Sequence, residues 1–177
     1  IEMIQPQKPV FGITGTNGKT TTTTLLKKIA YDNGIKPCEH DLAGMQGNAE
    51  FIPILQSRLN GDVGILEVGT FGVPGTVGRI VKDPSMSSGL ITNVTPDHLR
   101  DLGSFMEYAN VKGEFIKELG IGQLIVNGQD PTIIGLLRKL DFKGEVITFG
   151  VDELPDSIGM KECVCGREIA VKEIISG

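Results

Sequence analysis

The chain has 177 residues, of which 40% are apolar, and a formal net charge of -5. This length and apolar content predict one domain with a substantial core, and the acidic balance and low aromatic content argue against a nucleic-acid partner. The 3 cysteines are too few for a disulfide framework, no apolar run could cross a bilayer, and the start "IEMIQPQKPV" lacks a signal-peptide pattern. We therefore expect a cytoplasmic protein without membrane insertion.

Short apolar runs alternate with longer helical patterns along the chain. Runs rich in Val and Ile predict buried strands at 10–14, 63–69, 89–94, 123–128 and 145–150. Helical patterns lie between them, at 19–33, 49–59, 105–119 and 131–140. This alternation predicts an α/β fold, a doubly wound, mostly parallel sheet with helices on both faces, whose ligands bind at the carboxyl ends of the strands. The composition changes after Val151, and we interpret 152–177 as an insert.

The first strand leads into the glycine-rich sequence "GTNGKTT" and a long helix. Such a loop points backbone N–H groups at an anion on the helix N-terminus, and phosphate is the natural occupant. We predict a P-loop mononucleotide-binding domain in which Lys19 neutralises the β and γ phosphates and the Thr20 hydroxyl ligates Mg²⁺. Ile13 stands where the generic pattern has its first Gly, so a tight turn with an incidental Lys and Thr is the alternative. The predicted nucleotide-binding residues are Gly15, Thr16, Asn17, Gly18, Lys19, Thr20 and Thr21.

Two further candidate ligands follow at the ends of predicted strands. Glu67 ends the apolar strand "VGILE" at the edge where the phosphates should lie, and Mg²⁺ takes hard oxygen ligands such as a carboxylate. A strand-end Glu that caps a neighbouring helix is the alternative. His98 lies in "TPDHL", just after another strand and at the same edge. A lone His is more often structural than a ligand.

Lys112 lies on the apolar stripe of a predicted helix that begins with a capping box of Ser104 and Glu107. A buried ammonium is costly, and burial favours the free amine of lysine. A free amine can capture CO₂ as a carbamate, an anionic ligand that suits Mg²⁺. The alternative is a lysine that extends to the rim of the helix and keeps its charge in water.

Three segments in this order resemble the Mur ligase family: "GTNGKTTT", "GDVGILEVGTFGVPGTVGRI" and "LITNVTPDHLRDLGSFMEYANVKGEFI". The resemblance covers roughly residues 10–128. Members of this family are ATP-dependent enzymes that join an amino acid to a carboxylate, and relatives build folylpolyglutamate and cyanophycin. The resemblance implies an acyl-phosphate mechanism with ATP, Mg²⁺, an amino acid and a small cell-wall precursor as partners. It also implies that His98 and carbamylated Lys112 hold a second Mg²⁺, and that these two residues and Lys19 are catalytic.

The substrate is less defined by the resemblance. The stretch "LEVGTFGVPGTVGRI" is most similar to UDP-N-acetylmuramoyl-dipeptide ligases, and Arg79 matches a substrate-contacting arginine. Gly69-Thr70 replaces the usual Ser-Ser, and the run to Arg79 is about two residues longer, so a relative acting on archaeal pseudomurein is the alternative. A P-loop kinase or GTPase and a catalytically idle nucleotide-binding subunit are the other readings. We expect 1–177 to be an incomplete central ATP-binding domain, inactive alone, without the N-terminal and C-terminal domains of the family.

A cysteine pair lies in the segment interpreted as an insert. Cys163 and Cys165 precede Gly166, as in half of a zinc knuckle, which makes them candidate ligands of a structural zinc ion. The spacing is C-x-C and no second pair follows within the sequence. Free thiols are the alternative.

Overall fold

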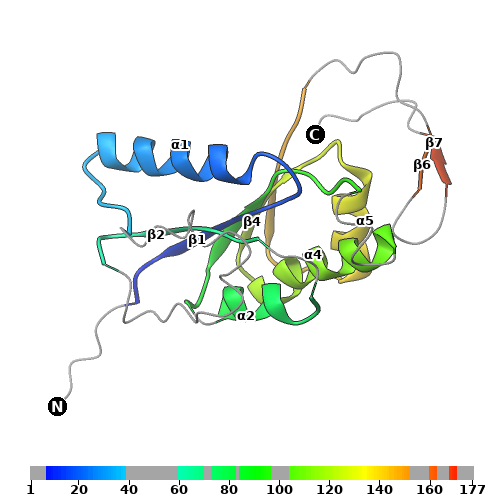
Figure 1. The fold of residues 1–177 in the computed structure, drawn as a ribbon, viewed down its shortest axis with the longest axis horizontal. Coiled ribbons are helices and arrows are strands. Elements are labelled where there is room, and N and C mark those ends of the chain that lie inside the picture. Colours follow the sequence, from blue (N-terminus) through cyan, green and yellow to red (C-terminus); the bar gives the residue numbers. More distant parts are fainter. Residues whose placement is uncertain are drawn as a thin grey trace.

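The computed structural model describes residues 7–38, 60–69, 73–82, 84–96 and 104–151, together with the backbone of 160–162 and 168–170. Figure 1 shows the elements. The strands are β1 Val10–Thr14, β2 Gly64–Glu67, β3 Ser88–Ile91, β4 Gln123–Asn127, β5 Glu145–Phe149, β6 Met160–Glu162 and β7 Glu168–Ala170. The helices are α1 Lys19–Asp32, α2 Thr76–Lys82, α4 Phe105–Leu119 and α5 Pro131–Lys139.

The strands β1 to β5 form one parallel sheet in the order β2-β1-β3-β4-β5. Strand β1 lies between β2 and β3, so the chain proceeds to opposite sides of β1 in its two directions. The carboxyl end of β1 is therefore a topological switch point, the place where ligands of open α/β sheets bind. The predicted α/β fold with a parallel sheet and helices on both faces is confirmed.

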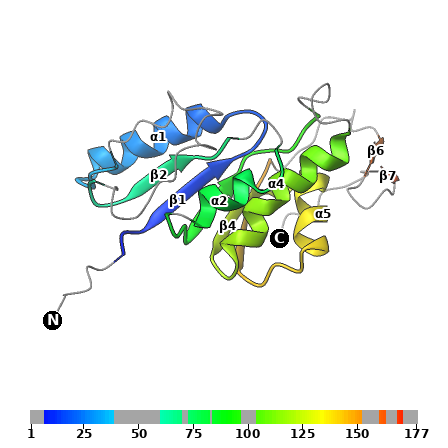
Figure 2. The ribbon, with the colours of Figure 1, turned by 60° about the horizontal axis from the view of Figure 1, so that its bottom comes forward.

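Two apolar clusters of unequal size lie on the two faces of the sheet. Helix α1 covers one face through a small cluster of Ile13, Ala30 and Ile65, whereas α2, α4 and α5 cover the other face through a much larger one (Figures 1 and 2). The larger cluster depends on strand glycines, because a Cβ at Gly89 would lie 2.4 Å from Cζ of Phe115. The ring of Phe115 thus packs directly on the backbone of the sheet.

The last strand of the sheet differs from its prediction. All five residues of β5 are exposed, including the apolar Val146, Ile147 and Phe149. The sequence predicted a buried strand, and this was wrong because β5 pairs only with β4 and lies at the edge of the described sheet. A run of β-branched and aromatic residues indicates a strand but not its place in the sheet order.

Other boundaries also differ from the prediction. The third strand ends at Ile91, and 92–94, predicted as strand, form irregular backbone instead. Helix α2 was not predicted, since its short sequence "TVGRIVK" holds a Gly and three β-branched residues. The segment predicted as an insert contains the antiparallel pair of β6 and β7. The predicted helix at 49–59 lies outside the described residues.

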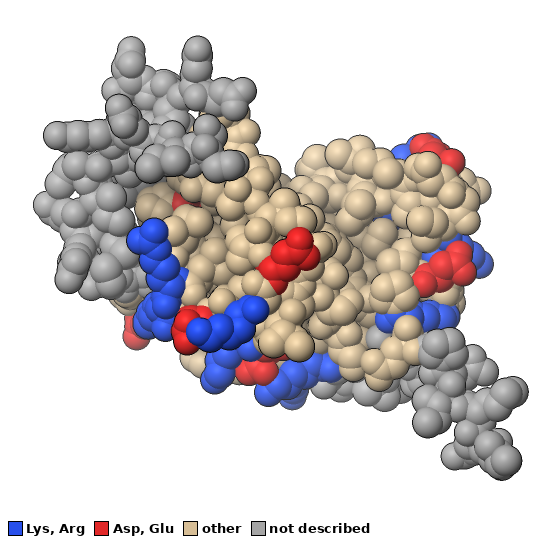
Figure 3. Space-filling view, turned by 180° about the vertical axis from the view of Figure 1, so that it is seen from behind, with Lys and Arg blue, Asp and Glu red and all other residues tan. Residues whose placement is uncertain are grey.

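The surface carries mixed charges. On the face seen in Figure 3, Lys and Arg side chains lie beside Asp and Glu along the lower margin. One ion pair of mixed charge lies on α1, where Lys28 contacts Asp32. Among the described helices, none is long and apolar enough to span a membrane.

Candidate functional site

The loop between β1 and α1 has a backbone that favours glycine at two positions. Gly15 has a φ of 142° and Gly18 a φ of 84°. Helix α1 begins at Lys19, and within the described chain no side chain caps its N-terminus at Gly18. The positive end of the helix dipole and its first N–H groups are therefore presented at the carboxyl edge of the sheet, as an anion site requires.

The predicted loop residues differ in where their polar groups point. Lys19 Nζ donates to the carbonyl oxygen of Thr16 at 2.8 Å, so this lysine folds back over the loop. The backbone N–H groups of Thr16 and Asn17 donate to Asn93, at 2.8 Å and 3.0 Å. Thr20 lies in the first turn of α1 and is exposed. The nucleotide-binding roles stay predictions, but Thr16 and Asn17 already use their N–H groups inside the protein.

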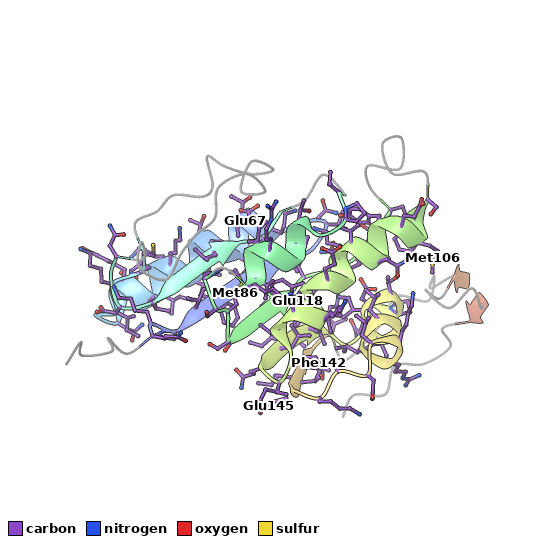
Figure 4. All side chains as sticks on the ribbon, turned by 90° about the horizontal axis from the view of Figure 1, so that it is seen from below. Glu67, Met86, Met106, Glu118, Phe142 and Glu145 are labelled. Carbon is purple, nitrogen blue, oxygen red and sulfur yellow. The ribbon has the colours of Figure 1, made fainter. Side chains whose placement is uncertain are left out.

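Glu67 lies at the end of β2 (Figure 4) and is 5% exposed. Among the described residues, neither of its carboxylate oxygens has a hydrogen-bond partner. Glu67 stands beside Ile13 in the register of β1 and β2, and Ile13 packs against α1, so Glu67 lies on the α1 face of the sheet. A buried carboxylate without donors is costly unless a cation compensates it. The helix-capping alternative finds no support in the described contacts.

A complete set of protein ligands for a metal is not seen. Within the described ranges, no group of three or more His, Cys, Asp or Glu side chains is placed to hold a metal ion. This agrees with the way Mg²⁺ is usually held, by one or two protein oxygens together with phosphate oxygens and water. Glu67 and the Thr20 hydroxyl fit such a site as partial ligands.

Lys112 is buried at the same edge of the sheet, on the opposite face. It is 2% exposed, and its Nζ donates to the carbonyl oxygen of Gly15 at 3.1 Å and lies 3.4 Å from Oγ1 of Thr14. The ammonium also lies 5.6 Å from the centre of the Tyr108 ring. Lys112 therefore reaches the phosphate loop from α4 and does not extend to the surface. Its carbamylation stays a prediction.

Tyr108 was not assigned a functional role from the sequence, where it was one member of an apolar stripe. Its hydroxyl lies 3.2 Å from Oγ1 of Thr16, and the residue is 2% exposed. The same Oγ1 accepts from Thr95 N–H at 3.0 Å. Thr16 thus joins the loop to α4 and to the segment after β3. A buried Tyr at helical spacing does not by itself indicate which hydroxyl it meets.

The remaining predicted residues are less well placed by the structure. Arg79 lies on α2 and is exposed. Helix α2 packs on α4, where the Glu114 carboxylate accepts from the N–H groups of Gly75 at 2.6 Å and Gly78 at 3.1 Å. His98 lies outside the described residues. The side chains of the cysteine pair at 163 and 165 lie outside them too, so the zinc prediction gains no support.

Comparison with known proteins places this arrangement in context. A family model described as the Mur ligase middle domain matches residues 13–170. A solved structure of a pseudomurein peptide ligase type C from Methanothermus fervidus is 36% identical, with a TM-score of 0.76, over 98% of this chain and 34% of that chain.

Curated relatives show the same partial coverage. A UDP-N-acetylmuramoylalanine-D-glutamate ligase of Caldanaerobacter subterraneus is 33% identical over 136 residues, which are 76% of this chain and 28% of the relative. An uncharacterized protein of Methanothermobacter thermautotrophicus is 30% identical over 147 residues, 82% of this chain and 45% of the relative. The chain thus spans less than half the length of these relatives.

Proposed function

The chain belongs to the Mur ligase family through its middle domain, and from this premise we propose that it binds ATP for an amide ligase. The ligase joins an amino acid to the carboxylate of a cell-wall precursor through an acyl phosphate. The observation that carries the proposal is Glu67, a buried carboxylate with two unpartnered oxygens one strand away from the phosphate loop. Such a group is stabilised only when a cation arrives, and a nucleotide on the loop brings Mg²⁺ with it.

The residues fit two metal positions in this proposal. Thr20 and Glu67 would hold one Mg²⁺ at the β and γ phosphates, and His98 with carbamylated Lys112 would hold the other. When bound, Mg²⁺ neutralises charge that develops on the phosphate oxygens. The burial of Lys112 beside Gly15 supports its share in the site, because a lysine on the rim of α4 could not reach the phosphate loop.

The protein acts mainly by positioning the reactants. The N-terminal amides of α1 and the Lys19 ammonium hold the β and γ phosphates of ATP. The substrate carboxylate attacks the γ phosphorus, which breaks the bond to the β-phosphate oxygen and yields an acyl phosphate and ADP. The amino group then attacks the acyl carbon, loses a proton and expels inorganic phosphate. Preorganised donors around the loop lower the barrier because they need not reorient as charge moves.

We propose a pseudomurein-type peptide precursor as the acceptor. The support is the 36% identity to a pseudomurein peptide ligase, together with the two departures from the dipeptide-ligase pattern around Gly69-Thr70 and Arg79. Exposed Arg79 on α2 is the candidate contact for the anionic precursor. Since the chain spans 34% of that ligase, we also propose that other parts of the protein bind the precursor and the amino acid. The cytoplasm, which supplies ATP, is the proposed location.

The test is to trap the acyl phosphate in the full-length protein. The protein is incubated with ATP, Mg²⁺, hydroxylamine and precursors of the muramyl and pseudomurein series, and hydroxamate and ADP are measured. We expect one hydroxamate for each ADP with the correct precursor, and none with Lys19→Ala. ADP formed without hydroxamate would indicate phosphate transfer to another group, as in a kinase. Bound nucleotide with no ADP from any precursor would indicate an idle nucleotide-binding subunit.

A further inference from the structure

The segment after β3 lies against the phosphate loop, and its Asn93 pairs with the backbone of Asn17. Asn93 Oδ1 accepts from the N–H of Asn17 at 3.0 Å, and Asn93 Nδ2 donates to the carbonyl oxygen of Asn17 at 3.1 Å. The carboxamide therefore satisfies both backbone groups of one residue. A pair of this kind resists rotation of the two peptide planes that flank Asn17, which lie in the middle of the loop.

Further contacts join the same segment to the start of the loop. The carbonyl oxygen of Asn93 accepts from Thr16 N–H at 2.8 Å. Thr92 Oγ1 donates to the carbonyl oxygen of Asn17 at 2.6 Å. At Gly15 the two pieces of chain are so close that a Cβ would lie 2.0 Å from Thr92 Oγ1. The segment 92–95 is thus a brace for the loop, and we use that name for these four residues below.

Asp130 holds the brace from the other side. Its carboxylate is buried, with 6% of the residue exposed, and Oδ2 accepts from Val94 N–H at 2.8 Å. The other oxygen, Oδ1, accepts from the N–H groups of Thr132 at 2.9 Å and Ile133 at 3.3 Å at the start of α5. Capping α5 requires only one oxygen, which a Ser could supply. The second oxygen fixes Val94, which lies directly after Asn93.

We propose that Asn93 and Asp130 are positioning residues for the nucleotide site, with Asn93 fixing the loop and Asp130 fixing Asn93 through the brace. The inference rests on the proposed function in taking the ligand to be a nucleotide with Mg²⁺. A loop already held in its binding conformation loses less entropy when the phosphates arrive. Each residue therefore raises nucleotide affinity, although neither is assigned a contact with the nucleotide.

The test measures Mg-ADP binding by calorimetry with the full-length protein and three variants, Asn93→Ala, Asp130→Ser and the double variant. The two single variants should each weaken Mg-ADP by about tenfold, the effect of losing one or two hydrogen bonds that order the loop. Because both act through one brace, the double variant should bind about as well as Asn93→Ala alone. Two residues with separate structural roles would instead give additive losses.

Ile133→Val is the matched control, since it trims a buried side chain of α5 and leaves the contact between Asp130 and Val94 intact. It should lower the free energy of unfolding without changing Mg-ADP affinity. Wild-type affinity in Asp130→Ser, or additive losses in the double variant, would overturn the inference while the proposed function stands. Absence of Mg-ADP binding by the wild-type protein would overturn both. Asn93 is only partly buried, so Asn93→Ala keeps the test decisive if Asp130→Ser fails to fold.

Discussion

Two buried ionisable side chains lie at the carboxyl edge of the sheet and are poorly compensated by the described protein. Glu67 has no hydrogen-bond donor on either oxygen, and Lys112 meets only neutral groups, a carbonyl, a hydroxyl and an aromatic ring. Such arrangements lower stability, and they occur where a site awaits a charged ligand. The charges are opposite, which suits a site that receives both metal ions and phosphates.

Replacing Glu67 by Gln should have opposite effects on stability and on binding. Without Mg²⁺, we expect Glu67→Gln to raise the free energy of unfolding by about 1 to 3 kcal/mol, because a buried unpaired charge is removed. Mg-ADP affinity should fall, because a ligand oxygen of the metal is lost. Urea unfolding in EDTA and calorimetry measure the two effects. Glu145→Gln, at an exposed position on β5, is the control and should change neither.

A loss of stability in Glu67→Gln with unchanged Mg-ADP affinity would contradict this prediction. It would show that the carboxylate has a structural partner beyond the described residues.

Carbamylation of Lys112 can be tested without turnover. We expect ¹³CO₂-labelled full-length protein with Mg-ADP to show a carbamate carbonyl signal by NMR that Lys112→Ala lacks. Lys117→Ala, which changes an exposed lysine on the same helix, should retain the signal. If Mg-ADP binds and no carbamate appears, the proposed metal roles of Lys112 and His98 lose their support.

At the scale of elements, α4 organises both sides of the site. Its Lys112 reaches the phosphate loop, and Glu114 caps the N-terminus of α2, which carries Arg79. Glu118, one turn further along α4, pairs with Lys82 near the C-terminus of α2 at 2.8 Å. The position of the candidate substrate arginine therefore depends on α4 at both ends of α2.

The cap and the ion pair should contribute unequally. We expect Glu114→Ala to lower the free energy of unfolding by about 1 to 2 kcal/mol, because two N–H groups lose a charged acceptor. Glu118→Ala should cost less than about 1 kcal/mol, because Lys82 is 63% exposed and water screens the pair. Urea unfolding measures the stability, and hydrogen exchange of the α2 amides should accelerate more in Glu114→Ala. Equal effects of the two changes would contradict this ranking.

At the scale of the whole molecule, the two faces of the sheet are unequally packed. The cluster under α2, α4 and α5 is large, whereas α1 and the phosphate loop are held by a small cluster and by the polar brace. The nucleotide-binding side is thus the less strongly packed side of the described fold. A ligand that binds there adds contacts where the protein has few.

Mg-ADP should therefore stabilise the whole fold. At 100 times its dissociation constant, we expect a gain of about 2.7 kcal/mol and a higher melting temperature in calorimetry. Lys19→Ala should lose most of this gain, because the lysine of the loop contacts the phosphates in our proposal. Lys28→Ala, on the exposed surface of the same helix, should keep it. A gain that persists in Lys19→Ala would show that Mg-ADP binds elsewhere.

Several elements and the phosphate loop could be predicted from the sequence. Strand β1 and helix α4 have the predicted bounds, since a short Val- and Ile-rich run and a capped apolar stripe are strong local signals. The loop could be predicted because its glycines, Lys19 and Thr20 are adjacent in the chain. Burial of Lys112 followed from its place on the apolar stripe.

The tertiary structure alone decided which distant groups meet. The exposed faces of β5 follow from its edge position, and the early end of β3 follows from the contacts that 92–95 make with the loop. Asp130 reaches Val94 across 36 residues, and Lys112 reaches Gly15 across 97. Local propensities depend on neighbours along the chain, whereas these contacts depend on the order in which parallel strands bring their carboxyl ends to one edge. The sequence therefore determined the nucleotide loop, and only the fold determined the residues that hold it in place.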